Sequence, residues 1–210
     1  MSGPNEPNGA GLSERGQEAY GDIPTDPDAF LTWSSRQPRE AGRFELSNGK
    51  VTQTVINVTR RHSIICLNIV GELKRLLNRK QFVVSSVDFA VRTAAGIRGP
   101  DVMVDSEDLP GDALATSHPI FIAEVLSPST AVLDVTTKQR EYTAIPSLKT
   151  YLVCGQDEPR AWVWARNADD SFPIDAEEFV GRDGVIPLTG LNIELSMAAI
   201  FEGIPDAPGS

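Results

Sequence analysis

The sequence predicts an α/β or α+β fold in which a sheet packs against helices. Three observations support this prediction. Residues 59–77 place apolar side chains at helical spacing on one face. Residues 120–126 (IFIAEVL) form an apolar run that suits a central strand. Residues 134–144 then read as a second helix between strand-like segments.

The remaining elements follow in chain order. A short helix at 26–35 precedes a hairpin at 44–55, where Asn48-Gly49 gives a two-residue turn signal. Thr59 suits the N-cap of the long helix. Further elements complete the predicted order: a strand at 82–92, a turn at 94–99, strands at 101–105, 148–154 and 161–165, a hairpin at 179–187 around Asp183-Gly184, and a closing helix at 197–201.

The chain of 210 residues suits one domain. We expect a disordered N-terminal lead at 1–22, a single domain at 23–204 and a tail at 205–210, because the first twenty residues are rich in Gly, Pro, Asn and Glu. No run of about 18 apolar residues exists to cross a membrane. Cys66 and Cys154 lie in apolar contexts and read as buried thiols, which favours a cytoplasmic setting. Together with two histidines, they lack the spacing of a structural zinc site.

The charge distribution is uneven. The net charge of −10 argues against a simple basic nucleic-acid binder, since such binding depends on Lys and Arg. Residues 56–100 nevertheless carry 8 basic and 2 acidic side chains, whereas 101–210 carry 6 and 19. A phosphate-binding face beside a metal site would give this pattern. Two solvated faces of opposite sign would also give it, and the charge pattern alone favours this second interpretation.

Two carboxylates stand out by position. Asp101 opens a short strand, and Glu124 lies within the apolar strand 120–126. A buried ionised carboxylate is costly unless it is paired or bound to a metal. The alternative for Glu124 is an exposed strand end with a salt bridge to a neighbour.

The following helix offers a partner. Asp134, Lys138 and Tyr142 are spaced at i, i+4 and i+8 and share a helix face. Lys138 could pair with Asp134, or it could point to the sheet and meet Asp101 and Glu124. Two carboxylates and an ammonium would bind a divalent cation and stabilise charge at a phosphate.

An ordered set of motifs resembles one family. RFELSNG at 43–49, PDVMV at 100–104 and AEVLSPST at 123–130 resemble motifs of the Uma2 family, also called DUF820. His62, Lys138 and Tyr142 follow the order of that family, and the resemblance covers about residues 26–201.

The resemblance implies a nuclease of the PD-(D/E)xK superfamily. The implied fold is a restriction-endonuclease-like core, with a mixed sheet flanked by helices and additional N- and C-terminal hairpins. The acids of the motif fall on Asp101 and Glu124, whereas its usual lysine position is Leu126. The family pattern implies that Lys138 restores the ammonium. The implied metal ligands for Mg²⁺ or Mn²⁺ are Asp101, Glu124 and the backbone carbonyl of Val125. Glu45 would help to hold a second cation, and Tyr142 would position Lys138 or a phosphate.

The resulting hypothesis is a metal-dependent endonuclease that hydrolyses DNA with metal-activated water. Its candidate DNA contacts are Arg60, Arg61, His62 and Arg75. A homodimer follows by analogy with enzymes that cut both strands. The alternatives are a weakly active or inactive nuclease-fold module that binds DNA or protein, and a nuclease for RNA or small nucleotides.

Overall fold

The computed structural model describes residues 20–54, 59–86, 89–106, 109–126 and 132–205. The side chains of 39, 54 and 132–134 lie outside this description. A six-stranded sheet has the order β11-β10-β9-β8-β6-β3, and a five-stranded sheet has the order β2-β1-β5-β4-β7. The strands of the large sheet are β3 (Val83–Ser86), β6 (Val102–Asp105), β8 (Pro119–Leu126), β9 (Thr150–Gly155), β10 (Arg160–Ala165) and β11 (Glu177–Val180).

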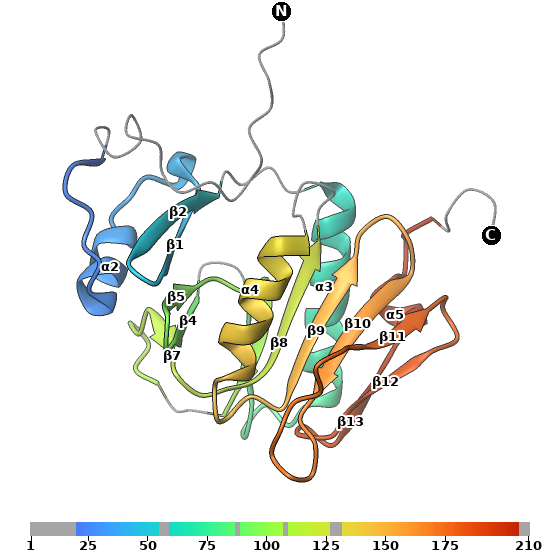
Figure 1. Ribbon diagram of the computed structural model, residues 1–210. Helices are drawn as coiled ribbons and strands as arrows, with labels where there is room; N and C mark the ends of the chain where they lie inside the picture. Colours follow the sequence, from blue (N-terminus) through green and yellow to red (C-terminus); the bar gives the residue numbers. More distant parts are fainter. Residues whose placement is uncertain (1–19, 55–58, 87–88, 107–108, 127–131, 206–210) are drawn as a thin grey trace, which may run out of the picture.

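The large sheet is mixed. Within it, β8 and β9 run parallel, while the other neighbouring pairs are antiparallel. The connection between β8 and β9 contains α4 (Val132–Thr143). This helix and α3 (Arg60–Leu76) lie on opposite faces of the sheet (Figure 1). The predicted mixed sheet flanked by helices is therefore confirmed.

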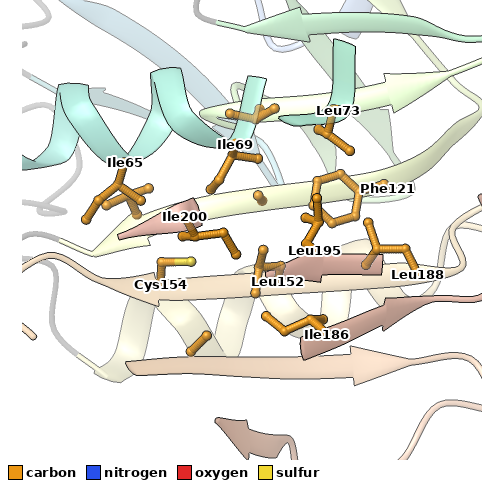
Figure 2. Packing of buried hydrophobic residues seen from close by; sticks show 14 of the residues in the cluster. Ile65, Ile69, Leu73, Phe121, Leu152, Cys154, Ile186, Leu188, Leu195 and Ile200 are labelled. Atoms are coloured by element: carbon orange, nitrogen blue, oxygen red, sulfur yellow. The ribbon is translucent and has the colours of Figure 1, made fainter. Parts of the chain in front are cut away.

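The face that α3 covers is apolar. Figure 2 shows Ile65, Ile69 and Leu73 of α3 packed towards Phe121 of β8 and Leu152 of β9. A two-stranded sheet and a short helix complete this cluster: β12 (Val185–Leu188), β13 (Ile193–Ser196) and α5 (Met197–Ile200). Cys66 and Cys154 are buried, free thiols in the same cluster, as predicted.

The opposite face has a second apolar cluster. Tyr142 of α4 packs there with Ile122, Met103, Tyr151 and Val153 of the large sheet. Tyr142 and Tyr151 meet edge to face, with ring centroids 5.2 Å apart.

The five-stranded sheet lies beside α4 (Figure 1). Its strands are β1 (Arg43–Ser47), β2 (Lys50–Thr54), β4 (Ala90–Thr93), β5 (Gly96–Arg98) and β7 (Ala115–Thr116). The predicted hairpin forms between β1 and β2, and Asn48 and Gly49 have φ of 49° and 76° at its turn. Phe44 and Leu46 face α2 (Pro27–Ser34), so the alternate positions of β1 face the other way.

Three predicted elements differ in the structure. The strand expected at 82–92 is two strands in different sheets, β3 and β4, with 87–88 outside the described residues. The period-two pattern continues on both sides of this break, so the pattern alone cannot locate it. The expected turn at 94–99 contains β5, which pairs with both β1 and β4.

The expected hairpin at 179–187 is wrong. β11 pairs with β10 in the large sheet, whereas β12 pairs with β13. Ile186 and Leu188 of β12 are buried in the α3-side cluster, and Phe179 of β11 packs against the same cluster. Among the described helices, none is long and apolar enough to cross a membrane.

Candidate functional site

The strand order places Asp101 beside the carboxyl end of β8. β6 runs antiparallel to β8, with Val102 opposite Ala123, so the residue that precedes β6 meets the end of β8. The backbone N–H of Val125 donates a hydrogen bond to Oδ2 of Asp101 at 2.9 Å. Asp101 is 8 % exposed. This hydrogen bond holds the Asp101 carboxylate beside the strand that carries Glu124, although Asp101 and Glu124 are far apart in the sequence.

Glu124 faces α4. Phe121, Ala123 and Val125 belong to the α3-side cluster, so Glu124 points to the other face of the sheet. Its Oε1 accepts hydrogen bonds from Nζ of Lys138 at 3.2 Å and from the Tyr142 hydroxyl at 3.0 Å. The alternative of an exposed strand end is wrong, because Glu124 is 8 % exposed. The alternative pairing of Lys138 with Asp134 falls on a side chain outside the described residues.

Glu45 reaches the same lysine from the small sheet. Its Oε1 lies 3.5 Å from Nζ of Lys138 and accepts the N–H of Gly99 at 3.1 Å. Its Oε2 accepts a hydrogen bond from Nη1 of Arg98 at 2.9 Å. Lys138 therefore lies between two carboxylates, one from each sheet.

Arg98 and Glu141 support this arrangement, and the sequence reasoning missed both. Nε and Nη2 of Arg98 each donate to the Glu141 carboxylate at 2.7 Å. Glu141 could have been predicted from the sequence, because it lies three residues after Lys138 on the same helix face. Arg98 gave no comparable signal, because residues 94–99 read as a turn.

His62 and Arg43 complete the surroundings of Asp101. Thr59 caps α3 by accepting the N–H of His62, and its hydroxyl donates to Gln156 just after β9. This anchors the start of α3 at the carboxyl edge of β8 and β9. Nε2 of His62 lies 3.2 Å from Oδ2 of Asp101, and Nη1 of Arg43 lies 4.0 Å from Oδ1.

Gly99 permits the approach of Arg43. A Cβ at Gly99 would lie 2.7 Å from Cδ of Arg43. The Arg43 guanidinium also donates a hydrogen bond to the Gly99 carbonyl. Any side chain at position 99 would therefore displace Arg43 from Asp101.

The ionisation of the three carboxyl groups differs. Burial raises the pKa of Glu124 to about 7, since Asp101 and Glu45 add to the effect and the attraction of Lys138 is too small to offset it. Burial also raises the pKa of Asp101, but the hydrogen bonds from His62 and Val125 have the larger, opposite effect. The pKa of Asp101 is therefore below its usual value. For Glu45, burial is likewise outweighed by Lys138 and Arg98, and the pKa falls below its usual value. Near neutral pH, Glu124 is thus the acid that exchanges a proton most readily.

The donor set suits a small hard cation. Among the described contacts, hydrogen bonds reach Oδ2 of Asp101 and Oε1 of Glu124, whereas Oδ1 of Asp101 faces Arg43 at 4.0 Å. Carboxylate oxygens are the protein ligands that Mg²⁺ prefers. The residue types present therefore suit a divalent cation, and a site between Asp101 and Glu124 stays a prediction. The Val125 carbonyl as a third ligand stays a prediction.

The candidate DNA contacts are spread along α3. Arg60 and Arg61 are exposed at its first turn, where Arg61 pairs with Asp157 at 3.0 Å. Arg75 pairs with Glu72 and lies 13 residues beyond His62, which corresponds to about 20 Å along a helix. The first turn of α3 is therefore close to the carboxylates, and Arg75 is far from them.

One family model matches most of this chain. The Uma2 family model, described as "Putative restriction endonuclease", matches residues 27–198. The chain belongs to the Uma2 family.

Two individual proteins are similar to this chain. The uncharacterized protein slr1290 of Synechocystis sp. is 24 % identical over 186 residues, which cover 85 % of this chain and 92 % of that protein. The crystal structure of a "putative nuclease belonging to DUF820" from Anabaena variabilis has a TM-score of 0.65 at 17 % identity, and the match covers 82 % of this chain and 97 % of that one. This second likeness shows that the two proteins share a fold.

Proposed function

We propose that this protein is a metal-dependent endonuclease that hydrolyses DNA phosphodiester bonds. One observation carries the proposal: at the carboxyl end of β8, Glu124 accepts a hydrogen bond from Lys138 of α4, and the next residue, Val125, donates its N–H to Asp101. The description of the Uma2 family and the name of the Anabaena variabilis protein both support nuclease chemistry.

Asp101 and Glu124 would hold Mg²⁺ or Mn²⁺ through carboxylate oxygens. Such a cation lowers the pKa of water and neutralises negative charge at phosphorus. Nζ of Lys138 can orient the attacking water and offset the charge that develops on the phosphate. Tyr142 keeps Glu124 in place through its hydrogen bond. Glu45 pairs with Lys138 from the small sheet, while its role in holding a second cation stays a prediction, because both of its oxygens already accept hydrogen bonds.

The position of Lys138 explains why residue 126 need not be a lysine. Residues 124 and 126 lie on the same face of β8, because side chains alternate along a strand. Leu126 packs against the α4-side cluster. Lys138 of α4 approaches that same face, so its ammonium reaches Glu124 from the helix rather than from the strand.

The phosphate backbone of the substrate would meet the first turn of α3. Arg60, Arg61 and His62 lie there, and the N–H groups of a helix N-terminus favour a phosphate. Arg43 lies near Oδ1 of Asp101, whereas His62 lies near Oδ2, so Arg43 could bind a second phosphate oxygen. A homodimer with two such sites would cut both strands.

The test is cleavage of supercoiled plasmid in Mg²⁺ or Mn²⁺. We expect Asp101→Asn and Lys138→Ala to lose at least about 100-fold in rate, since each removes charge stabilisation at the reacting phosphate. The matched control is Lys149→Ala, which removes only an exposed ion pair with Asp170.

Equal rates in all four proteins would contradict the proposal. DNA binding without cleavage by the wild type would favour the non-catalytic module. Preferential cleavage of RNA or small nucleotides in a parallel assay would instead redirect the substrate assignment.

A further inference from the structure

A second group of potential metal ligands lies on the other side of Asp101. His62, Cys66 and Asp101 each offer one ligand atom, and these atoms lie within 4.8 Å of one another. We propose that these three residues form a site for a thiophilic divalent cation such as Zn²⁺, and that filling it inhibits the enzyme by taking Asp101 from the catalytic cation. The inhibitory part rests on the proposed nuclease function, whereas the binding part does not.

The helix supplies two of the ligands. His62 and Cys66 are four residues apart in α3 and therefore share one face. Sγ of Cys66 lies 3.6 Å from Nδ1 of His62. Two ligands of one tetrahedral zinc ion lie about 3.3–3.7 Å apart, given zinc bonds of about 2.0–2.3 Å. This pair is therefore already at the spacing that the ion requires.

The third ligand comes from the sheet. Asp101 now contacts Nε2 of His62, on the side of the ring that faces away from Cys66. Cys66 and Asp101 contact different nitrogens of the ring, so the His62 ring or the Asp101 carboxylate has to move when the ion binds. The three ligand atoms, which already lie within 4.8 Å of one another, then reach the tetrahedral spacing of about 3.3–3.7 Å. The hydrogen bond from the Val125 N–H orients the Asp101 carboxylate, as outer hydrogen bonds commonly do at metal sites.

The ligand types select the ion. Thiolate and imidazole favour Zn²⁺ and similar soft cations, whereas Mg²⁺ is bound through oxygen. The side chains of His62 and Asp101 are each 12 % exposed, which gives the ion a path and water a place as fourth ligand. Binding would release the Cys66 thiol proton to solvent.

The two sites then compete for one carboxylate. Asp101 can complete the oxygen site with Glu124 or the sulfur-containing site with His62 and Cys66. An ion held by the second set places a divalent positive charge beside the first, so a second cation is repelled as well as deprived of its ligand.

Cobalt(II) provides a direct probe, because its coordination to a thiolate gives a charge-transfer absorption band. We expect one Co²⁺ per chain with this band in the wild type and in Cys154→Ala. Cys154 is the matched control, since it is also a buried free thiol in the α3-side cluster but is not part of the ligand group. Cys66→Ala should lose the band, and His62→Gln should weaken Co²⁺ binding at least about tenfold.

Absence of the band in folded wild-type protein would overturn the proposal, as would its loss in Cys154→Ala with retention in Cys66→Ala. If Cys66→Ala fails to fold, His62→Gln still tests the site. Unchanged Co²⁺ binding in the His62→Gln variant would also overturn the proposal.

The inhibitory role has its own measurement. In excess Mg²⁺, the Zn²⁺ concentration that halves cleavage should be at least about tenfold higher for Cys66→Ala than for the wild type or Cys154→Ala, each taken relative to its own activity without Zn²⁺. Equal inhibition of all three would overturn the role of this site in inhibition. The thiolate band of Co²⁺ in a protein that cleaves no DNA would support the site and overturn the proposed function, whereas DNA cleavage by a protein that shows no such band would do the opposite.

Discussion

The two faces of the large sheet use the same strands for opposite purposes. On the α3 face, Phe121, Ala123 and Val125 of β8 belong to a cluster of buried apolar side chains and thiols. On the α4 face of the same strand, Ile122 is followed by Glu124, which is buried beside Lys138. The α3 face stabilises the fold through apolar burial, while the α4 face combines an apolar cluster with charges that are kept out of water at a cost in stability. The candidate site thus depends on a core that lies on the other side of the sheet.

The largest effect should come from the α3 face. Phe121 is fully buried between α3 and the neighbouring strands. We expect Phe121→Ala to lower the free energy of unfolding by about 3–5 kcal/mol, because it removes buried apolar area and leaves a cavity. Chemical denaturation monitored by circular dichroism would measure this. A loss below about 1 kcal/mol would show that the α3 face is not the main source of stability.

A smaller loss is expected from the ion network of the α4 face. Arg98 is 5 % exposed and bridges Glu45 and Glu141. Arg98→Met should cost about 3 kcal/mol, because it leaves two buried carboxylates without their main partner. Lys138 still faces Glu45 and limits the loss. The double variant with Glu141→Gln should recover part of the stability, and failure to recover any would contradict the charge explanation.

The smallest effect concerns Glu124 and depends on pH. Its pKa in the folded protein is raised to about 7, so the folded state binds more protons than the unfolded state between about pH 4.5 and 7. The wild type should therefore lose stability relative to Glu124→Gln as pH rises through this window.

In metal-free buffer we expect the two proteins to be similar near pH 5. The Gln variant should be more stable by roughly 2 kcal/mol near pH 8. Melting temperatures in EDTA across this range would test the expectation. A difference that does not change with pH, or one that grows in the opposite direction, would show that burial does not control this carboxyl group.

Most secondary structure could be predicted from the sequence, for local reasons. The Asn48-Gly49 turn, the Thr59 N-cap and the spacing of Ile65, Ile69 and Leu73 are signals that lie within a few residues of one another. The errors arose where pairing is long-range. β5 pairs with β1, some fifty residues earlier, and β11 pairs with β10 rather than with β12.

The candidate site divides in a similar way. Asp101, Glu124 and Lys138 could be named from the sequence, since an acid in an apolar strand and a motif order are visible there. Arg98 and Glu141 were missed, because nothing local links a residue in an apparent turn to a helix more than forty residues later. The pair of His62 and Cys66 was present in the sequence at helical spacing, but it acquires a third ligand only through Asp101.

The sequence by itself determined the elements, the uneven charge and the residue types that chemistry at a phosphate requires. Only the tertiary structure decided which of them meet. The antiparallel pairing of β6 with β8 sets Asp101 beside Val125, and the packing of α4 over β8 sets Lys138 and Tyr142 on Glu124. The physical reason is that ionic and hydrogen-bond contacts act over a few ångströms. Their strength therefore depends on chain topology and burial rather than on distance along the chain.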